Sequence, residues 1–186
     1  MKEQIIARGT LFELVQLPQP NGRVFELARR APGVRLIVAD KAAKKVLLTK
    51  EYRHELKTSD YRLPGGKVFD SLKEYDTHRA SGDDILKAAA AKVKAEAAEE
   101  AGIEATEVRL VKKSTLGATV EWDLYIFEAL TWKEHKDGQS LEDGEQVESV
   151  EWFSFDVAEK MILNGDLKEE RIALILLQWL RGKHED

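Results

Sequence analysis

The stretch Ala95-Glu96-Ala97-Ala98-Glu99-Glu100-Ala101-Gly102-Ile103 organises the interpretation of this chain. It ends an alanine-rich segment that predicts a helix over residues 84–101, and its glycine suits the left-handed position that closes a helix. Residues three and four apart share a helix face, so Glu96, Glu99 and Glu100 project together. Carboxylates this close repel one another and raise each other's pKa unless a cation lies between them. The pattern therefore predicts a hard divalent cation with oxygen ligands, such as Mg²⁺.

The neighbouring segments favour a functional site over a solvated acidic face, which is the alternative for a run of this kind. An apolar stripe lies roughly a quarter turn away and would dock the helix on a core: Leu86, Ala90, Val93, Ala97 and Ala101. Upstream, the run Leu63-Pro64-Gly65-Gly66-Lys67-Val68 contains a glycine pair, which lets backbone approach a ligand closely. The acids are therefore expected at the edge of a cleft.

The run LPGGKV, followed by a helix that ends EAAEEAGI, resembles the Nudix hydrolase family. The family signature contains a glycine, a first glutamate and the run REUxEExGU, where U is aliphatic, and the matching positions here are Glu96, Glu99, Glu100, Gly102 and Ile103. The chain departs from the signature at the arginine, which is Ala95, and at the first glutamate, which falls on Lys87. Lys92, one turn before the first matching glutamate, is a candidate replacement for the arginine. The glycine pair also lies about twice as far from the acids as in the family, so we expect an insertion within residues 69–83.

The resemblance is closest to the ADP-ribose pyrophosphatase and nucleoside diphosphate sugar hydrolase branch. It implies an α+β Nudix fold, a mixed β-sheet sandwiched between helices, with an N-terminal antiparallel β extension. The implied organisation is a hairpin in residues 1–32 and a Nudix domain in residues 33–186. The metal ligands implied are the Gly65 carbonyl, Glu96, Glu99 and Glu100, with Mg²⁺ as the cofactor and Mn²⁺ as the alternative.

Further site residues are implied by shorter matches to the same branch. Glu51-Tyr52-Arg53 matches a stretch like QYR, so Arg53 is expected to bind phosphate with its planar fork of donors; the alternative is a surface arginine paired with Glu51 or Glu55. Gly66 is expected at the substrate. The stretch 115–121 replaces a Ser-Pro-Gly-Gly…Ser-Glu pattern, and it places Gly117 and Glu121 as substrate contacts, although Leu116 stands where the branch has its proline.

The general base is expected on a loop before the last strand of the sheet. Asp143-Gly144-Glu145-Gln146-Val147 aligns with stretches like ENEDI in the branch. Glu145 is the first choice for the base and Glu142 the second, with Glu99 as a further catalytic candidate. A base must reach the water that it deprotonates, which sequence does not show. The alternative for Glu145 and Glu142 is a charged surface loop.

Composition bounds the class of protein. The 186 residues are 43% hydrophobic and 34% charged, which suits one domain, or one domain with a small extension. The net charge of −5 argues against non-specific binding to nucleic acid. The absence of cysteine excludes disulfides and thiol chemistry. We find no signal-peptide pattern or apolar run long enough to span a bilayer, so no membrane partner is expected and a cytoplasmic location is the default.

The remaining chain predicts strands, then helices at the C-terminus. Strands are expected at 5–15, 24–30, 34–39, 46–49, 107–113, 122–129 and 147–155, and helices at 156–163 and 167–181. Residues 69–83 are polar without a clear period, and we expect a flexible loop near the cleft. The first two strands carry apolar groups on both faces, among them Ile5, Phe12, Leu14, Val24 and Phe25. This predicts a homodimer through the hairpin, with a monomer as the alternative.

These observations favour Mg²⁺-dependent hydrolysis of the pyrophosphate bond of a small-molecule nucleoside diphosphate linked to another group, most favourably ADP-ribose or a nucleotide sugar. One alternative is a Nudix hydrolase of another nucleotide. A second is a catalytically weak Nudix module that binds a nucleotide, which the loss of the signature arginine would support.

Overall fold

A computed structural model describes residues 2–117, 119–136, 138–141 and 147–182. Along the chain the elements are β1 (Gln4–Arg8), β2 (Phe12–Pro18), β3 (Val24–Arg30), β4 (Gly33–Ile37), β5 (Ala39–Asp40), β6 (Lys45–Arg53), β7 (Thr58–Arg62), α1 (Leu72–Ser81), α2 (Ile85–Ala101), β8 (Ile103–Ser114), β9 (Val120–Glu121), β10 (Leu124–Glu134), β11 (Val147–Ser154), α3 (Phe155–Leu163) and α4 (Glu170–Arg181). None of these helices is both long and apolar enough to cross a membrane.

The described strands form three sheets. The first has the order β1-β2-β3-β9, the second β4-β10-β8, and the third β11-β6-β5, with β7 paired to β6. In the second sheet β4 runs parallel to β10, whereas β8 runs antiparallel to it. The short β7 was absent from the sequence expectation, because Thr58–Arg62 is too polar to suggest a strand.

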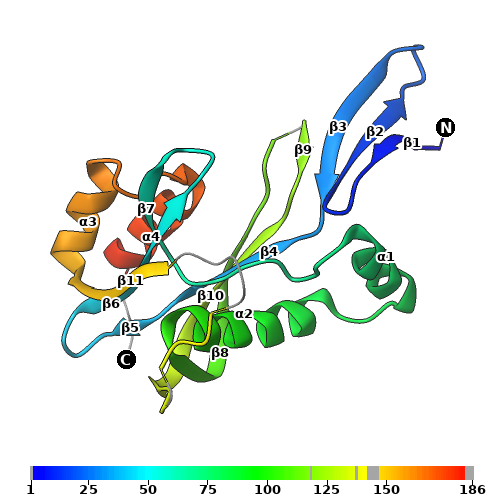
Figure 1. Cartoon of the computed structure of the whole chain (residues 1–186). Helices are drawn as coiled ribbons and strands as arrows, with labels where there is room; N and C mark the ends of the chain where they lie inside the picture. Colours follow the sequence, from blue (N-terminus) through cyan, green and yellow to red (C-terminus); the bar gives the residue numbers. More distant parts are fainter. Residues whose placement is uncertain (1, 118, 137, 142–146, 183–186) are drawn as a thin grey trace.

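Two apolar clusters lie on opposite sides of β4, because alternate side chains of a strand point to opposite faces. Val34 and Leu36 belong to the cluster that includes the buried face of α2, whereas Ile37 belongs to the cluster that includes α3 and α4. Figure 1 shows α2 on one side of β4 and β10, and the pair α3 and α4 on the other. This sandwich holds α2 firmly, so any side chain at its C-terminal end has a defined position.

Helix α2 begins and ends where local sequence chemistry predicts. The Asp84 side chain accepts a hydrogen bond from Leu86 N at 2.9 Å, which caps the N-terminus. Gly102 closes the helix at φ 62°, a conformation that costs glycine little. Val93 and Ala97 are fully buried against β4 and β8. The predicted helix over residues 84–101 is confirmed.

The N-terminal residues form three strands rather than the expected two-stranded hairpin. A turn at residues 9–11, closed by the hydrogen bond from Gly9 N to Phe12 O at 2.7 Å, divides the predicted first strand into β1 and β2. Arg29 ties the sheet together, because its guanidinium contacts the carboxylates of Glu3, Glu13 and Glu121 at 2.8–3.0 Å. The strands β1, β2 and β3 project from the rest of the molecule (Figure 1).

The expectation of a flexible loop at residues 69–83 is wrong, because most of this segment is helix α1. Ser71 caps the helix by accepting from Glu74 N at 3.2 Å, and Gly82 ends it at φ 74°. Leu72 is 1% exposed, and its backbone N–H donates to Thr10 O at 2.8 Å. The helix escaped prediction because it buries a single large apolar residue and so has no visible period.

Candidate active site

The glycine pair and the end of α2 meet through main-chain and carboxylate groups. Gly65 N–H donates to Glu100 Oε2 at 2.6 Å. A Cβ atom at Gly65, whose φ is 143°, would lie 2.3 Å from Val34 O, so no other residue fits there. A Cβ atom at Gly66 would lie 2.3 Å from Glu96 Oε1. Gly65 therefore allows the close approach of the β4 backbone, and Gly66 allows the close approach of the Glu96 carboxylate.

Glu100 is a buried carboxyl whose charge is poorly compensated. Its pKa is raised to about 8, chiefly by burial and also by the like charges of Glu51 and Glu96, while Arg35 and the Gly65 N–H oppose the change. The repulsion expected from clustered acids is therefore present at this position, although burial contributes more than the like charges do.

Glu96 has the basic partner that the sequence predicted. Lys92 Nζ lies 3.1 Å from Glu96 Oε1, one helical turn away. Burial lowers the pKa of Lys92, but the hydrogen bond and charge of Glu96 outweigh it, so the pKa is raised overall. Glu99 is partly buried, and its backbone carbonyl accepts a hydrogen bond from Ser140 N at 3.0 Å.

A cleft of about 420 Å³ opens above the glycine pair and Glu100. Its walls come from β3, β4, β6, β7 and the residues before β10, and four arginines contribute to them. The described lining residues are Arg30, Arg35, Glu51, Tyr52, Arg53, His54, Glu55, Arg62, Gly65, Gly66, Lys67, Glu100, Trp122, Leu124 and Val147. No residue of 69–83 is among them, so the expectation that this segment lies near the cleft is also unsupported.

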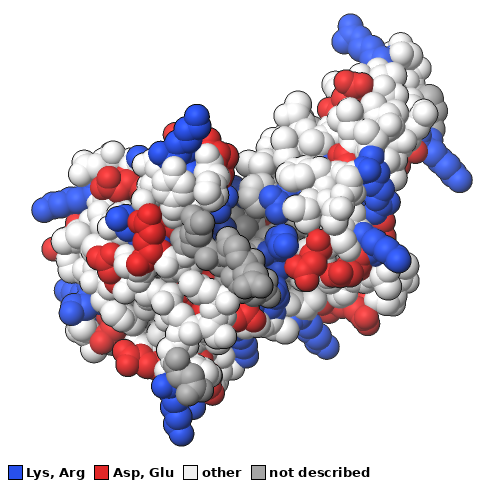
Figure 2. Space-filling model, viewed as in Figure 1, with Lys and Arg blue, Asp and Glu red and all other residues white. Residues whose placement is uncertain are grey.

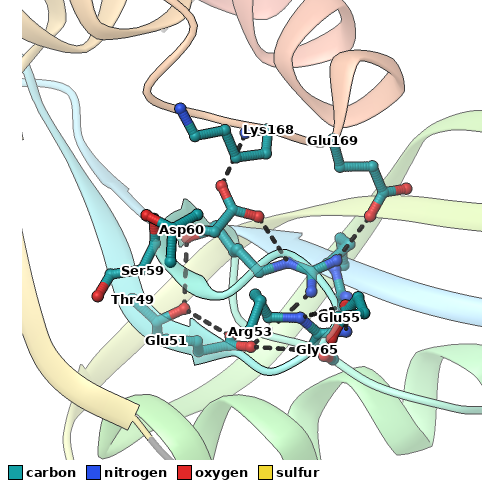
Figure 3. A network of polar contacts seen from close by, with 12 residues as sticks. Thr49, Glu51, Arg53, Glu55, Ser59, Asp60, Gly65, Lys168 and Glu169 are labelled. Atoms are coloured by element: carbon teal, nitrogen blue, oxygen red, sulfur yellow. Dashed lines mark hydrogen bonds and ion pairs between the residues drawn. The ribbon is translucent and has the colours of Figure 1, made fainter.

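Two of the cleft arginines are neutralised by carboxylates. Arg53 contacts Glu55 at 2.6 Å and Glu51 at 3.6 Å. Arg62 contacts Glu169 at 2.6 Å, and Asp60 and Glu51 at 3.8 and 3.9 Å. Figure 3 shows this network, in which side chains of β6 and β7 meet Glu169 at the start of α4. Arg53 therefore both lines the cleft and forms the carboxylate pairs that were its alternative.

The third cleft arginine is stacked rather than paired. The Arg30 guanidinium lies over the Trp122 ring at 4.4 Å and over Phe12 at 5.1 Å. Arg171 covers Trp122 as well, at 4.2 Å. These contacts join the N-terminal sheet, the residues before β10 and α4 at the cleft wall.

The other residues expected at the site do not line the cleft or lie outside the described residues. Gly117 is exposed, and neither it nor Glu121 is among the residues that line the cleft. The Glu121 carboxylate accepts from Arg29 Nε at 2.9 Å. Glu142 and Glu145 lie outside the described residues, so the proposed base is not placed.

The donor chemistry at the glycine pair fits a hard cation, although the donors are not gathered around one point. Within the described residues no three His, Asp or Glu side chains form a group that could hold a metal. The Gly65 carbonyl accepts a hydrogen bond from Arg35. Nevertheless, Glu96 and Glu100 offer buried carboxylate oxygens beside a backbone carbonyl, the ligand types that Mg²⁺ prefers. A divalent cation beside Glu100 would oppose the rise in its pKa, because an opposite charge favours the ionised carboxylate.

The sequence interpretation overlooked several residues of the cleft: Arg30, Arg35, Arg62 and Trp122. Arg35 had a visible signature, since it is the one charged residue in the apolar run Gly33–Ala39. Arg30, Arg62 and Trp122 had no such signature in the sequence, because separate parts of the chain bring them to the cleft.

The fold and this cleft define an α+β domain with buried acids on a glycine-bordered helix end, facing a wall of arginines. A family model, the NUDIX domain, matches residues 29–174, and the chain belongs to this family. A solved structure described as "Crystal structure of ADP compounds hydrolase" is similar in fold, with a TM-score of 0.68 and 20% sequence identity over 98% of this chain and 94% of that one. No curated protein matches the chain by sequence. The predicted α+β Nudix fold is confirmed, as is the Nudix pyrophosphohydrolase class at the level of the family.

Proposed function

We propose that the protein hydrolyses the pyrophosphate bond of a nucleoside diphosphate linked to a second group, with ADP-ribose or a nucleotide sugar as the favoured substrate. The observation that carries this proposal is the cleft of about 420 Å³, which joins an acidic floor to walls rich in arginine. A volume of this order suits a small molecule, and guanidinium groups suit phosphate. The structure described as an ADP compounds hydrolase adds support through its shared fold.

The chain's own groups hold and orient the substrate. Gly66 leaves the Glu96 carboxylate close to the backbone, Gly65 N–H donates to Glu100, and the basic groups Arg30, Arg35 and Lys67 line the cleft. Glu96, Glu99, Glu100 and the Gly65 carbonyl would hold Mg²⁺, or Mn²⁺ as the alternative. When bound, the metal neutralises the pyrophosphate and lowers the pKa of a water molecule. Phosphoryl transfer depends largely on such positioning and charge stabilisation.

The proposed general base is Glu145, with Glu142 as the second choice. Val147, the first residue of β11, lines the cleft. Glu145→Gln should lower kcat more than it raises KM, because a base acts in the transition state. If only Glu142→Gln has this effect, the base is Glu142; if neither variant does, the base is elsewhere.

The deciding experiment measures the two products of pyrophosphate cleavage, a nucleoside monophosphate and the phosphorylated second group, from a panel of nucleoside diphosphate compounds, with and without Mg²⁺, for the wild type and Glu100→Gln. We expect metal-dependent turnover that Glu100→Gln lowers by at least about a hundredfold, as when a charge-stabilising group is lost. Equal turnover by both proteins would contradict a catalytic role of the acidic helix end.

Two other functions are separated by the same panel. Leu116, at the position where the branch has proline, favours a different nucleotide substrate, which would appear as activity on another compound. Ala95 favours a weakly catalytic module, which would bind nucleotides without turnover. Lys92 beside Glu96 counts against the second alternative, because it restores a basic partner to the acids.

We also propose a homodimer formed through the N-terminal sheet. The strands β1, β2 and β3 leave several large apolar side chains exposed, namely Ile5, Ile6, Phe12, Leu14, Val24 and Phe25. In Figure 2 most of the visible surface of this lobe belongs to uncharged residues. A surface of this kind suits a self-complementary contact about a two-fold axis. The division at residues 32 and 33 and the cytoplasmic location remain predictions.

A further inference from the structure

Arg35 is a charged residue inside the core of the central sheet. Strand β4 is buried at every position, and Arg35 shares with Ile37 the face opposite Val34 and Leu36. The residue is 9% exposed, yet it lines the cleft beside Gly65, Gly66 and Glu100. Its guanidinium therefore occupies the floor of the proposed active site.

The hydrogen bonds of this guanidinium are incomplete. Nη1 donates to the Gly65 carbonyl and to Val34 O, the latter at 3.2 Å. Nε is buried and has no hydrogen-bond partner in the structure. Among the described residues, no carboxylate forms an ion pair with Arg35 within 4.0 Å, in contrast to Arg53 and Arg62. A guanidinium normally satisfies five N–H donors, so this one retains donors for a ligand.

The surroundings make the charge of Arg35 costly to keep. The residue is buried, and its Nε has no hydrogen-bond partner in the structure. A buried cation without a paired anion destabilises a fold unless something else satisfies it. The cleft is the open side of this site, and a phosphate group could enter it and accept from the unsatisfied donors.

We propose that Arg35 is a substrate-binding residue that holds a phosphate oxygen of the substrate on the cleft floor beside Glu100. This inference rests on the proposed function, because it assumes a pyrophosphate in the cleft. It differs from the sequence expectation, which assigned phosphate binding to Arg53. Arg53 pairs with two carboxylates already, whereas within the described residues the hydrogen bonds of Arg35 go to backbone carbonyls. Arg35 of β4 thus binds the anion. Arg53 and Arg62, whose charges are neutralised by carboxylates, form the neighbouring wall of the cleft.

The test is calorimetric titration of inorganic pyrophosphate in the presence of EDTA, so that no metal or turnover is involved. The variants are Arg35→Met, which has similar length without charge, and Arg35→Lys, which keeps the charge without the planar fork. Arg181→Met is the control, because it removes a guanidinium that pairs with Glu159 outside the cleft. Thermal unfolding of each protein is measured alongside.

We expect Arg35→Met to weaken pyrophosphate binding at least about tenfold, the effect of losing a charge-assisted hydrogen bond. Arg35→Lys should weaken it less, and Arg181→Met should leave it unchanged. The Tm of Arg35→Met should equal or exceed that of the wild type, because an uncompensated buried charge is removed.

Unchanged affinity in Arg35→Met overturns the inference, and so does a wild type that does not bind pyrophosphate. If Arg35→Met fails to fold, Arg35→Lys decides, and an affinity equal to that of the wild type then overturns the inference. A wild type that binds pyrophosphate but hydrolyses no nucleotide compound contradicts the proposed function alone. Hydrolysis with pyrophosphate affinity unchanged in the Arg35 variants contradicts only the role of Arg35.

Discussion

Glu100 should make the metal-free protein less stable as the pH rises from about 4.5 to about 8. Its pKa in the folded chain is about 8, against 4.5 for an ordinary glutamate, chiefly because the carboxyl is buried. Between these values the folded chain keeps a proton on Glu100 that the unfolded chain releases. The contribution of Glu100 to stability is therefore fully present below pH 4.5 and is lost as the pH rises through 8.

The size of the effect follows from the same two pKa values. At about 1.4 kcal/mol per pKa unit, the gap between 4.5 and about 8 sets a ceiling of roughly 5 kcal/mol for the loss. Glu100→Gln supplies the reference, because glutamine stays neutral at every pH and resembles the protonated acid in shape. All other titrating groups are shared, so the difference between the two proteins isolates Glu100.

The assay is urea unfolding of both proteins in EDTA at pH 5, 6, 7 and 8. The free energies of unfolding should be close at pH 5, and the wild type should become progressively less stable than Glu100→Gln toward pH 8. Mg²⁺ added at pH 8 should recover stability in the wild type and not in the variant, since a ligand that binds the folded chain stabilises it. A difference that does not depend on pH, or that favours the wild type at pH 8, would refute the assignment of an uncompensated buried acid.

Three further predictions concern other parts of the molecule. Gly66→Ala should lower kcat/KM by about a hundredfold, because its Cβ atom would lie 2.3 Å from Glu96 Oε1 and must displace that carboxylate; steady-state kinetics measures this, and wild-type activity would contradict the close approach. Leu72→Ala should cost about 2–5 kcal/mol in urea unfolding, because Leu72 is 1% exposed and anchors α1; a negligible change would mean that α1 is not anchored by this residue. Light scattering coupled to size exclusion should give a mass about twice 21.1 kDa, and Phe25→Asp should reduce it to that of the monomer. A wild-type monomer would exclude the dimer, and a dimer that survives the substitution would place the interface elsewhere.

Local spacing in the sequence was enough to locate the acidic end of α2. Asp84, the alanine run and Gly102 begin, fill and close the helix through interactions that span at most five residues. The contact from Lys92 to Glu96 has the same origin, since helical geometry alone brings residues i and i+4 together. The Nudix resemblance depended on the same short-range pattern, which explains why the family could be named from it.

The local sequence pattern did not predict helix α1, because this helix buries little apolar surface. Helix α1 has a Ser71 cap, a Glu74 that accepts from Asp70 N at 3.1 Å, and a closing Gly82. These residues were visible in the sequence, but hydrophobic periodicity is the main indicator of a helix, and α1 buries only Leu72 among its large side chains. The polar composition of the segment therefore suggested a loop.

The environment of each charge was decided by the tertiary structure. Arg62 meets Glu169 across 107 residues of chain, and Gly65 meets Glu100 across 35. Arg35 reaches the glycine pair because β4 passes beneath it, which nothing in the neighbouring sequence requires. Sequence spacing determines which groups share a helix face, whereas the free energy of a charge depends on what surrounds it in three dimensions. For this reason the sequence by itself determined where the acids are, and only the folded chain decided which arginines are left to bind an anion.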